Sequence, residues 1–331
     1  MQVHFLIPDP GAFQSGGNRY NAALIAALRQ RQVHVSHSPF NPEIYYASPD
    51  TIYVLDSLYF ESIAQPDALP PQCLALVHHL NSMYPGGPGY YERHEAPVLE
   101  RMAGYIATSH FTREYLAERG LEEQQIVVIE PVVDRPTEIP DREVARVRGL
   151  IVANCIPRKG VLPFLQALAD ARPQPYFDLN VIGSLQHDET YARSCQALIR
   201  ETPVLAQCVR LMGEQDDATL HGYYDKSNIF LSPSEFETFG MAIQEAIVYG
   251  LPALVHSGGN SEHHVRPGVN GEVFTSHQQM ARTFAGMVDD LESLRQLHLS
   301  IQSFEDPYLD DWLVAADLLT EFVDRLSTQA S

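Results

Sequence analysis

The apolar residues of the chain fall into short continuous runs that alternate with longer segments of helical spacing. The first run, 3–7, is closed by Pro8 and Gly11, and residues 20–28 then place alanine and leucine at the spacing of a helix. Short apolar runs closed by proline or glycine are typical of strands buried in a parallel sheet. The order of strand, glycine loop, helix and strand recurs along the chain, which predicts an α/β protein built on parallel sheets.

The same pattern assigns most of the chain to regular elements. Strands are predicted at 3–7, 33–35, 51–55, 73–77, 105–108, 126–129, 150–153, 177–182, 209–212, 229–231 and 252–256. Helices are predicted at 20–28, 92–102, 111–118, 162–171, 191–201, 218–226, 240–249, 278–299 and 310–326. Ser109 is well placed to cap the helix at 111–118, and Gly120 to end it. Asn270-Gly271 has the composition of a hairpin turn.

A change of composition divides the chain in two. Prolines and charged residues interrupt 130–148, and segments of this kind commonly join domains. We therefore expect two Rossmann-like, doubly wound domains, over 1–148 and 149–307, with a C-terminal helix in 308–331 completing the first. Ligands of open parallel sheets bind beyond the carboxyl ends of the strands, so a binding cleft is expected between the halves.

Charge and composition narrow the function classes. The formal net charge is −20, and Lys159 and Lys226 are the only lysines. A chain this acidic repels nucleic acid and anionic lipid headgroups, so we expect it to bind neither nucleic acid nor membranes. Its first apolar run is too short for a signal peptide, and no run approaches the ~20 residues of a membrane helix. The four cysteines show no C-x-x-C spacing, so a cytoplasmic protein with reduced thiols is expected.

The segment 232–250 carries the strongest chemical pattern. Glu237 and Glu245 are separated by seven residues, with Phe239-Gly240-Met241 between them. The glycine permits a tight turn and a close approach of backbone to ligand, and the helix that follows offers its N–H groups and dipole to an anion. Carboxylates make strong hydrogen bonds to sugar hydroxyls. The alternative is a surface helix with an acidic residue at its start.

This segment resembles the sugar-donor signature of the retaining GT-B glycosyltransferases, in particular family four, the glycosyl transferases of group 1. The resemblance implies a GT-B fold and a nucleoside diphosphate sugar as donor. It implies that Glu237 and the backbone of 239–241 hold the sugar, and that Glu245 holds the ribose. The sequence has no D-x-D motif of the metal-dependent glycosyltransferases, so we expect no metal and no cofactor beyond the donor substrate.

Residues 151–160 resemble the start of the donor domain of this family, where an arginine and a lysine hold the diphosphate. Lys159 and Gly160 match that pattern, but the arginine position is Asn154. Arg158 can supply the missing charge from a different direction, although a solvated loop is the alternative. Cations beside the diphosphate stabilise the leaving group. An asparagine at position 154 therefore weakens the inference that a protein with this donor site is also an active enzyme.

The resemblance assigns weaker roles in the first half. Gly16-Gly17 would let the backbone approach the diphosphate and the acceptor, although a plain turn explains the pair equally well. His78, after the strand at 73–77, matches a family histidine near the donor sugar, where it can bind a hydroxyl or take a proton. A structural histidine is the alternative. The aromatic, glycine-rich residues 84–91 are a candidate acceptor lid.

In the second half, Gly183 and Met212-Gly213 end strands where the family places the nucleobase. The sequence thus predicts a retaining hexosyltransferase that moves a sugar from a nucleoside diphosphate donor to a hydroxyl of a small soluble or glycan acceptor. Two alternatives stay open, a non-catalytic GT-B module that binds a nucleotide sugar or a partner, and a GT-B nucleotide-sugar epimerase. Whether the chain forms a homodimer is also left open.

Overall fold

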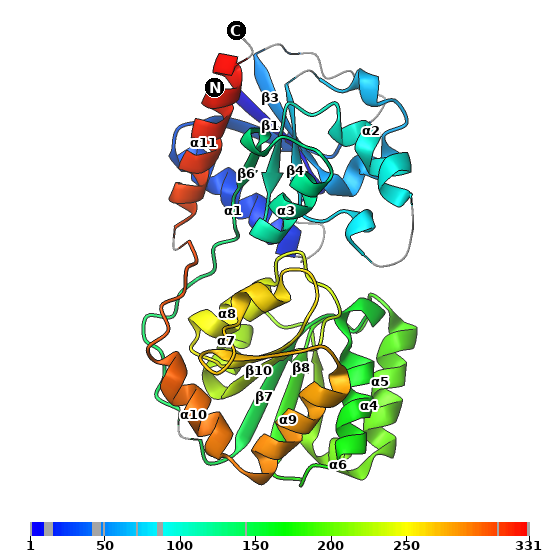
Figure 1. The fold of residues 1–331 in the computed structure, drawn as a ribbon, viewed down its shortest axis with the longest axis vertical. Helices are drawn as coiled ribbons and strands as arrows, with labels where there is room; N and C mark the ends of the chain where they lie inside the picture. The colour runs from blue at the N-terminus through cyan, green and yellow to red at the C-terminus, as the bar shows by residue number, and fades with distance from the viewer. Residues whose placement is uncertain are drawn as a thin grey trace. The chain divides into compact units, whose positions relative to one another are not determined.

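The computed structural model describes residues 2–9, 16–41, 48, 50–70, 72–84, 89–142, 144–309 and 311–329. The chain forms two compact units, Met1–Val132 with Tyr308–Ser331, and Val133–Pro307. Each unit is built on a six-stranded sheet whose neighbouring strands all run parallel (Figure 1). The predicted α/β class with two doubly wound parallel sheets is confirmed.

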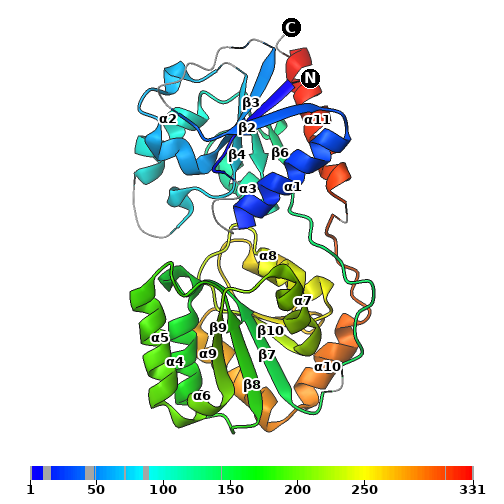
Figure 2. The same ribbon diagram turned by 180° about the vertical axis from the view of Figure 1, so that it is seen from behind.

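The first sheet has the strand order β2-β1-β3-β4-β5-β6. Its strands are β1 (Gln2–Leu6), β2 (His34–Ser38), β3 (Thr51–Asp56), β4 (Cys73–Val77), β5 (Gly104–Ala107) and β6 (Ile126–Val128). Its longer helices are α1 (Gly16–Gln30), α3 (His110–Glu118) and α11 (Trp312–Gln329). The helices α1 and α11 lie side by side (Figures 1 and 2), where Leu24 and Phe322 join a core with Phe5 and Leu76.

The second sheet has the strand order β12-β11-β10-β7-β8-β9. Its strands are β7 (Val147–Val152), β8 (Phe177–Ile182), β9 (Val209–Gly213), β10 (Ile229–Ser232), β11 (Ala253–His256) and β12 (Gly271–Phe274). Its helices are α4 (Val161–Ala171), α5 (Glu189–Glu201), α6 (Pro203–Cys208), α7 (Asp217–Lys226), α8 (Met241–Val248), α9 (His277–Asp289) and α10 (Glu292–Ile301). Phe284 of α9 meets the rings of Phe164 and Phe177 edge-on, at 6.5 and 5.4 Å between centroids.

Local signals in the sequence account for several element boundaries. The strand predicted at 73–77 is β4, and all five of its residues are buried. Ser109 accepts a hydrogen bond from the Thr112 N–H at 3.0 Å, which confirms its predicted role as the N-cap of α3. Gly120, with φ +85°, follows the end of α3, and the left-handed region favours glycine there.

The hairpin predicted at Asn270-Gly271 is wrong. Residues 271–274 form β12, which pairs in parallel with β11, Gly271 opposite Ala253. Parallel neighbours need a crossover rather than a hairpin turn. A Cβ on Gly271 would lie 1.9 Å from the Ala253 carbonyl oxygen, so the glycine serves this close strand approach.

Two predicted helices differ in detail, and one helix was not predicted. The helix expected over 278–299 is interrupted at Asp290, which is extended and whose Oδ1 accepts from the Glu292 N–H at 3.0 Å. The helix expected over 92–102 is a π-helix, η4 (Tyr91–Glu95), followed by the short α2 (Ala96–Leu99). The short helix α6 was not predicted, because its six residues are too few to show the apolar spacing of a helix.

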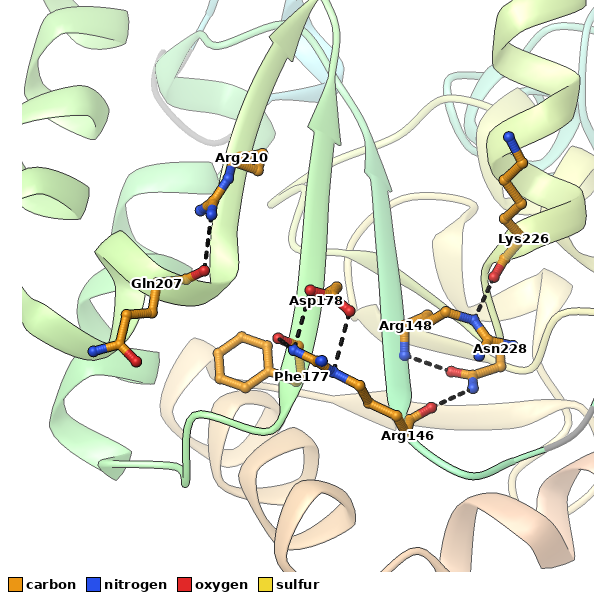
Figure 3. Close-up of polar contacts among 8 residues, drawn as sticks. All are labelled: Arg146, Arg148, Phe177, Asp178, Gln207, Arg210, Lys226 and Asn228. Atoms are coloured by element: carbon orange, nitrogen blue, oxygen red, sulfur yellow. Dashed lines mark hydrogen bonds and ion pairs between the residues drawn. The ribbon is translucent and has the colours of Figure 1, made fainter.

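The first unit ends at Val132, earlier than the expected 148, because residues near 146–148 bind to the second unit (Figure 3). Asn228 ties this segment down, since its side chain donates to the Arg146 carbonyl at 2.6 Å and accepts from the Arg148 N–H at 2.7 Å. The Arg148 guanidinium donates to the Lys226 carbonyl at 2.6 Å. The boundary at Val132 lies within the segment 130–148 that composition marks as the linker, and these bonds from side chains at distant positions join the end of that segment to the second unit.

Candidate donor-sugar site

Two loops at the carboxyl end of the second sheet bind one another. One follows β7 and carries Arg158 and Lys159, and the other follows β10 and leads to α8. The Glu235 N–H donates to the Arg158 carbonyl at 3.0 Å. Gly160, at φ +64°, has no room for a side chain, because a Cβ there would lie 2.0 Å from the Pro233 carbonyl oxygen. The close approach of the loops depends on this glycine.

Lys159 and Glu237 form an ion pair between these two loops. Their side chains are 19% and 14% exposed, so both remain within reach of a ligand. Burial by itself raises the pKa of Glu237, but the Lys159 ammonium, the Arg158 charge and a hydrogen bond from Ser234 together hold that pKa below its usual value. The sequence prediction named both partners of the pair, which lie 78 residues apart.

The backbone around Glu237 is fixed by the loop that follows β11. The Asn260 N–H donates to the Glu237 carbonyl at 2.7 Å, and the Glu237 N–H donates to the Gly258 carbonyl at 3.3 Å. A Cβ on Gly259 would lie 2.1 Å from the Glu237 carbonyl oxygen. The glycine pair 258–259 therefore lets two backbones meet beside the carboxylate.

The N-terminus of α8 lies three residues beyond Glu237. Gly240 occupies the cap position at φ +99°, and within the described part of the chain no side chain makes a capping hydrogen bond there. The preceding Phe239 carbonyl accepts from Asn260 Nδ2 at 2.9 Å and from His264 Nε2 at 2.6 Å. An uncapped helix start held in place by neighbouring side chains suits an anion or a polar hydroxyl.

Asn260 and His264 were not singled out as site residues from the sequence. Both act through a backbone carbonyl, and no motif in the sequence encodes such a contact. Burial lowers the pKa of His264 to about 4, so the ring stays neutral and donates one N–H to Phe239.

Glu245 lies on the second turn of α8, 7% exposed. Its Oε2 accepts a hydrogen bond from the Tyr224 hydroxyl of α7 at 2.7 Å. One carboxylate oxygen therefore already has a partner within the protein. The ribose-binding role of Glu245 stays a prediction.

Asn154 joins the ends of β7 and β8. Its Oδ1 accepts from the Ser184 N–H at 2.9 Å, and the Cys155 N–H donates to the Ser184 carbonyl at 2.9 Å. The neighbouring Gly183 is packed so closely that a Cβ would lie 2.2 Å from the Ala153 carbonyl oxygen. Asparagine at 154 thus provides an acceptor that an arginine side chain lacks.

Met212 and Gly213 end β9 beside these strands. The Gly183 N–H donates to the Gly213 carbonyl at 3.0 Å, and the Met212 carbonyl accepts from Gln215 Nε2 at 2.8 Å. The predicted donor residues of the second unit thus share the carboxyl end of one sheet: Asn154, Arg158, Lys159, Gly183, Met212, Gly213, Glu237, Phe239, Gly240 and Met241.

The first unit brings the other predicted residues together. Gly16 and Gly17 belong to the first turn of α1 rather than to a loop. A Cβ on Gly17 would lie 3.5 Å from the His78 ring, so the two predicted features are neighbours. The ring of His79 meets that of Tyr84 at 6.2 Å between centroids, while residues 85–88 of the predicted acceptor lid lie outside the described residues.

Within the described part of the chain, no group of three or more His, Cys, Asp or Glu residues is arranged to hold a metal ion. None of the described helices combines the length and the apolar character that crossing a membrane requires.

Comparison with known proteins finds a family model that matches most of the second unit. Residues 146–302 match the family model described as glycosyl transferases group 1. No curated protein matches the chain by sequence.

Solved structures resemble the whole chain. The sucrose-phosphate synthase of Thermosynechococcus elongatus is 18% identical, with a TM-score of 0.74 over 100% of both chains. Anabaena HepE in complex with UDP and glucose is 16% identical, with a TM-score of 0.72 over 98% of this chain and 100% of HepE. The lipopolysaccharide outer core galactosyltransferase WaaB is 18% identical, with a TM-score of 0.64 over 98% of this chain and 99% of WaaB. The chain therefore has the GT-B fold, and its residues 146–302 match the family model of the glycosyl transferases group 1.

Proposed function

We propose that this protein is a retaining glycosyltransferase that moves a hexose from a nucleoside diphosphate sugar to a hydroxyl of a small soluble or glycan acceptor. The observation that carries the proposal is the Lys159–Glu237 pair beside the uncapped start of α8. A cation and a carboxylate in contact, next to a helix start that no described side chain caps, match the two ends of a sugar diphosphate. The group 1 family match and the HepE complex with UDP and glucose support a nucleotide-sugar donor.

Donor binding would convert this ion pair into two ligand contacts. The diphosphate is the stronger anion, so it attracts the Lys159 ammonium, with Arg158 close by. Glu237 then accepts hydrogen bonds from sugar hydroxyls. Its lowered pKa keeps it in the accepting, ionised form.

The reaction then needs little from the protein beyond charge and position. The bond between the anomeric carbon and the diphosphate oxygen breaks, and the acceptor oxygen bonds to that carbon on the same face. The acceptor proton passes to the departing diphosphate, whose negative charge Lys159, Arg158 and the α8 N-terminus stabilise. His78 would bind a hydroxyl of the reacting sugars.

Asn154 favours one alternative, a GT-B module that binds the donor without turning it over. Its side chain joins two loops where the family carries a cation for the diphosphate. An epimerase acting on the donor itself is the other alternative. Product analysis with and without an acceptor separates all three functions.

The decisive experiment screens UDP, GDP, ADP and dTDP sugars by thermal shift and then measures turnover of the donor that binds. At 100 times its dissociation constant a ligand stabilises the fold by about 2.7 kcal/mol, which a thermal shift detects. Glu237→Gln should lower kcat about 10²- to 10³-fold, because it removes charge from the site of reaction.

The two lysines provide a matched pair of variants. Lys159→Met should abolish most donor binding, while Lys226→Met, at the far end of α7 (Figure 3), should leave binding unchanged. Equal donor affinity in the Lys159 and Lys226 variants, or unchanged turnover in Glu237→Gln, would refute the proposed site.

A further inference from the structure

A chain of three polar side chains lies at the carboxyl end of the first sheet. Asn21 belongs to α1, Asp56 ends β3, and His78 follows β4. Asn21 Nδ2 donates to Asp56 Oδ2 at 3.2 Å, and His78 Nε2 lies 2.9 Å from Asn21 Oδ1. Asn21 is 0% exposed and Asp56 is 1% exposed, so solvent does not compete for these bonds.

The chemistry of these groups determines where the proton of His78 sits. The Asp56 carboxylate accepts from the Leu58 N–H at 3.0 Å through Oδ1, and its Oδ2 faces Asn21. A carboxylate only accepts, so Asn21 must turn its NH₂ group toward Asp56. The carbonyl oxygen of Asn21 then faces His78, and Nε2 must carry the proton that this oxygen accepts.

The other ring nitrogen of His78 is left to accept. Among the described residues, none makes a hydrogen bond to Nδ1. Tyr20 packs edge-on against the ring at 5.1 Å between centroids, and its hydroxyl is engaged with the Ile129 carbonyl at 2.9 Å. Gly17 adds no side chain over the ring, where a Cβ would come within 3.5 Å. The His78 side chain remains 13% exposed.

We propose that Asn21 and Asp56 are positioning residues that hold the proton of His78 on Nε2, so that Nδ1 accepts a hydrogen bond from a hydroxyl of the substrate. That the hydroxyl belongs to a sugar rests on the proposed function. The tautomer of His78 follows from the first unit alone. Burial lowers the pKa of His78 and the nearby Asp56 charge opposes this, so the ring is neutral near neutral pH.

The substitution Asp56→Asn tests this assignment, because it replaces one carboxylate oxygen of Asp56 by an NH₂ group and leaves the size of the side chain unchanged. The amide oxygen of the new side chain can keep the cap bond to the Leu58 N–H, which leaves the new NH₂ group facing Asn21. Asn21 must then flip to present its oxygen, and its own NH₂ turns toward His78. Nε2 becomes the acceptor, and the proton moves to Nδ1.

Nitrogen-15 NMR of histidine-labelled full-length protein at pH 8 measures this tautomer directly. The spectrum of His78→Gln identifies the His78 signals. The wild type should show a protonated Nε2 and an unprotonated Nδ1, and Asp56→Asn should show the reverse. Asp188→Asn, which alters a helix cap far along the chain, serves as the matched control and should leave the His78 signals unchanged.

The exchanged double variant Asn21→Asp/Asp56→Asn provides the rescue. Its carboxylate at position 21 accepts from both neighbours, so the proton should return to Nε2. Asp56→Asn should lower kcat about 10²-fold with KM little changed, and the double variant should recover most of that loss. If Asn21 and Asp56 only stabilised the fold, the single variant would not invert the His78 tautomer, and the double variant would not restore the tautomer and kcat.

The inference is overturned if the wild type carries the proton on Nδ1, or if Asp56→Asn leaves the tautomer unchanged. It is also overturned if the tautomer inverts while donor turnover stays at the wild-type rate. If the tautomer inverts but the wild type turns over no nucleotide sugar at all, the proposed function fails and the assignment of Nε2–H stands, while the substrate contact fails with the function.

Discussion

At the scale of single residues, the donor site depends on how two loops approach each other. Lys159 and Glu237 meet because the loops after β7 and β10 share a backbone hydrogen bond, from the Glu235 N–H to the Arg158 carbonyl. The approach is possible because position 160 has no side chain. A glycine is therefore as important to the ion pair as the charged residues themselves.

Gly160→Ala tests this dependence, with Gly120→Ala as its matched control. Both glycines have left-handed backbones, at φ +64° and +85°, so alanine strains both by about 1–2 kcal/mol. A Cβ at 120 meets nothing within 4 Å, whereas one at 160 lies 2.0 Å from a carbonyl oxygen. Urea denaturation should show a loss of about 2–5 kcal/mol for Gly160→Ala, because overpacking adds to the strain.

Donor binding should separate the same two variants. Gly160→Ala pushes the loops apart and should weaken donor binding, while Gly120→Ala should retain the wild-type affinity. Similar losses of stability in the two variants would show that the close contact at 160 relaxes without cost.

At the scale of elements, helix starts are where the sequence was most informative. Ser109, Asp188, Asp216 and Ser276 each accept a hydrogen bond from an N–H in the first turn of their helix. The start of α8 differs from these four, because its cap is Gly240 and no side chain of the described residues caps it. The start of α4, at Gly160, also has no side-chain cap within the part of the chain described, so what distinguishes α8 is the Lys159–Glu237 pair beside its start.

Ser109→Ala should lower the free energy of unfolding by about 1–2 kcal/mol, because the cap bond to the Thr112 N–H is lost in a buried setting. Ser194→Ala is the control, since that exposed hydroxyl in the middle of α5 donates to the Thr190 carbonyl at 3.0 Å. Mid-helix serine gains little from such a bond, so Ser194→Ala should be neutral or slightly stabilising. Equal losses in urea denaturation would contradict the capping role.

At the scale of the molecule, partly or fully buried histidines that stay neutral make the protein sensitive to acid. Burial lowers the pKa of histidines in both units: His4, His78, His256, His264 and His298. The unfolded chain takes up protons at their ordinary pKa of about 6.5, where the folded chain does not. Stability therefore falls as the pH drops from 6.5 through the folded pKa values.

Glu237 also makes the stability of the fold decrease as the pH falls, over a lower pH range than the histidines. Its folded pKa lies below the ordinary value, so its contribution is present above that value and is lost as the pH falls through the folded pKa. Urea denaturation between pH 7.5 and 4.5 should show a steady decline in stability.

His264→Asn should flatten that decline. The folded pKa of His264 is about 4, so this residue alone accounts for about 3 kcal/mol of acid sensitivity between pH 6.5 and 4. Asparagine does not titrate, and its shorter side chain gives up the hydrogen bond of Nε2 to the Phe239 carbonyl, so the slope of stability against pH tests the assignment rather than the stability at neutral pH. The same pH slope in His264→Asn and the wild type would refute the assignment.

The sequence by itself determined the local structure of this protein, that is, its strands, helix caps and turns. Strand β4, the cap at Ser109 and the glutamate–glycine pattern around Gly240 are read from neighbouring residues, because apolar runs, caps and turns depend on short-range spacing. The donor-site prediction reached further through a family resemblance, which assigned Lys159 and Glu237 to the same donor.

Only the tertiary structure decided which distant residues meet. It paired β12 in parallel with β11, joined residues 133–148 to the second unit, and gave Glu245 a partner in Tyr224. It also assembled Asn21, Asp56 and His78 from three separate elements. Such contacts depend on strand order and on close backbone approaches between segments far apart in the chain, and no short-range pattern contains that information.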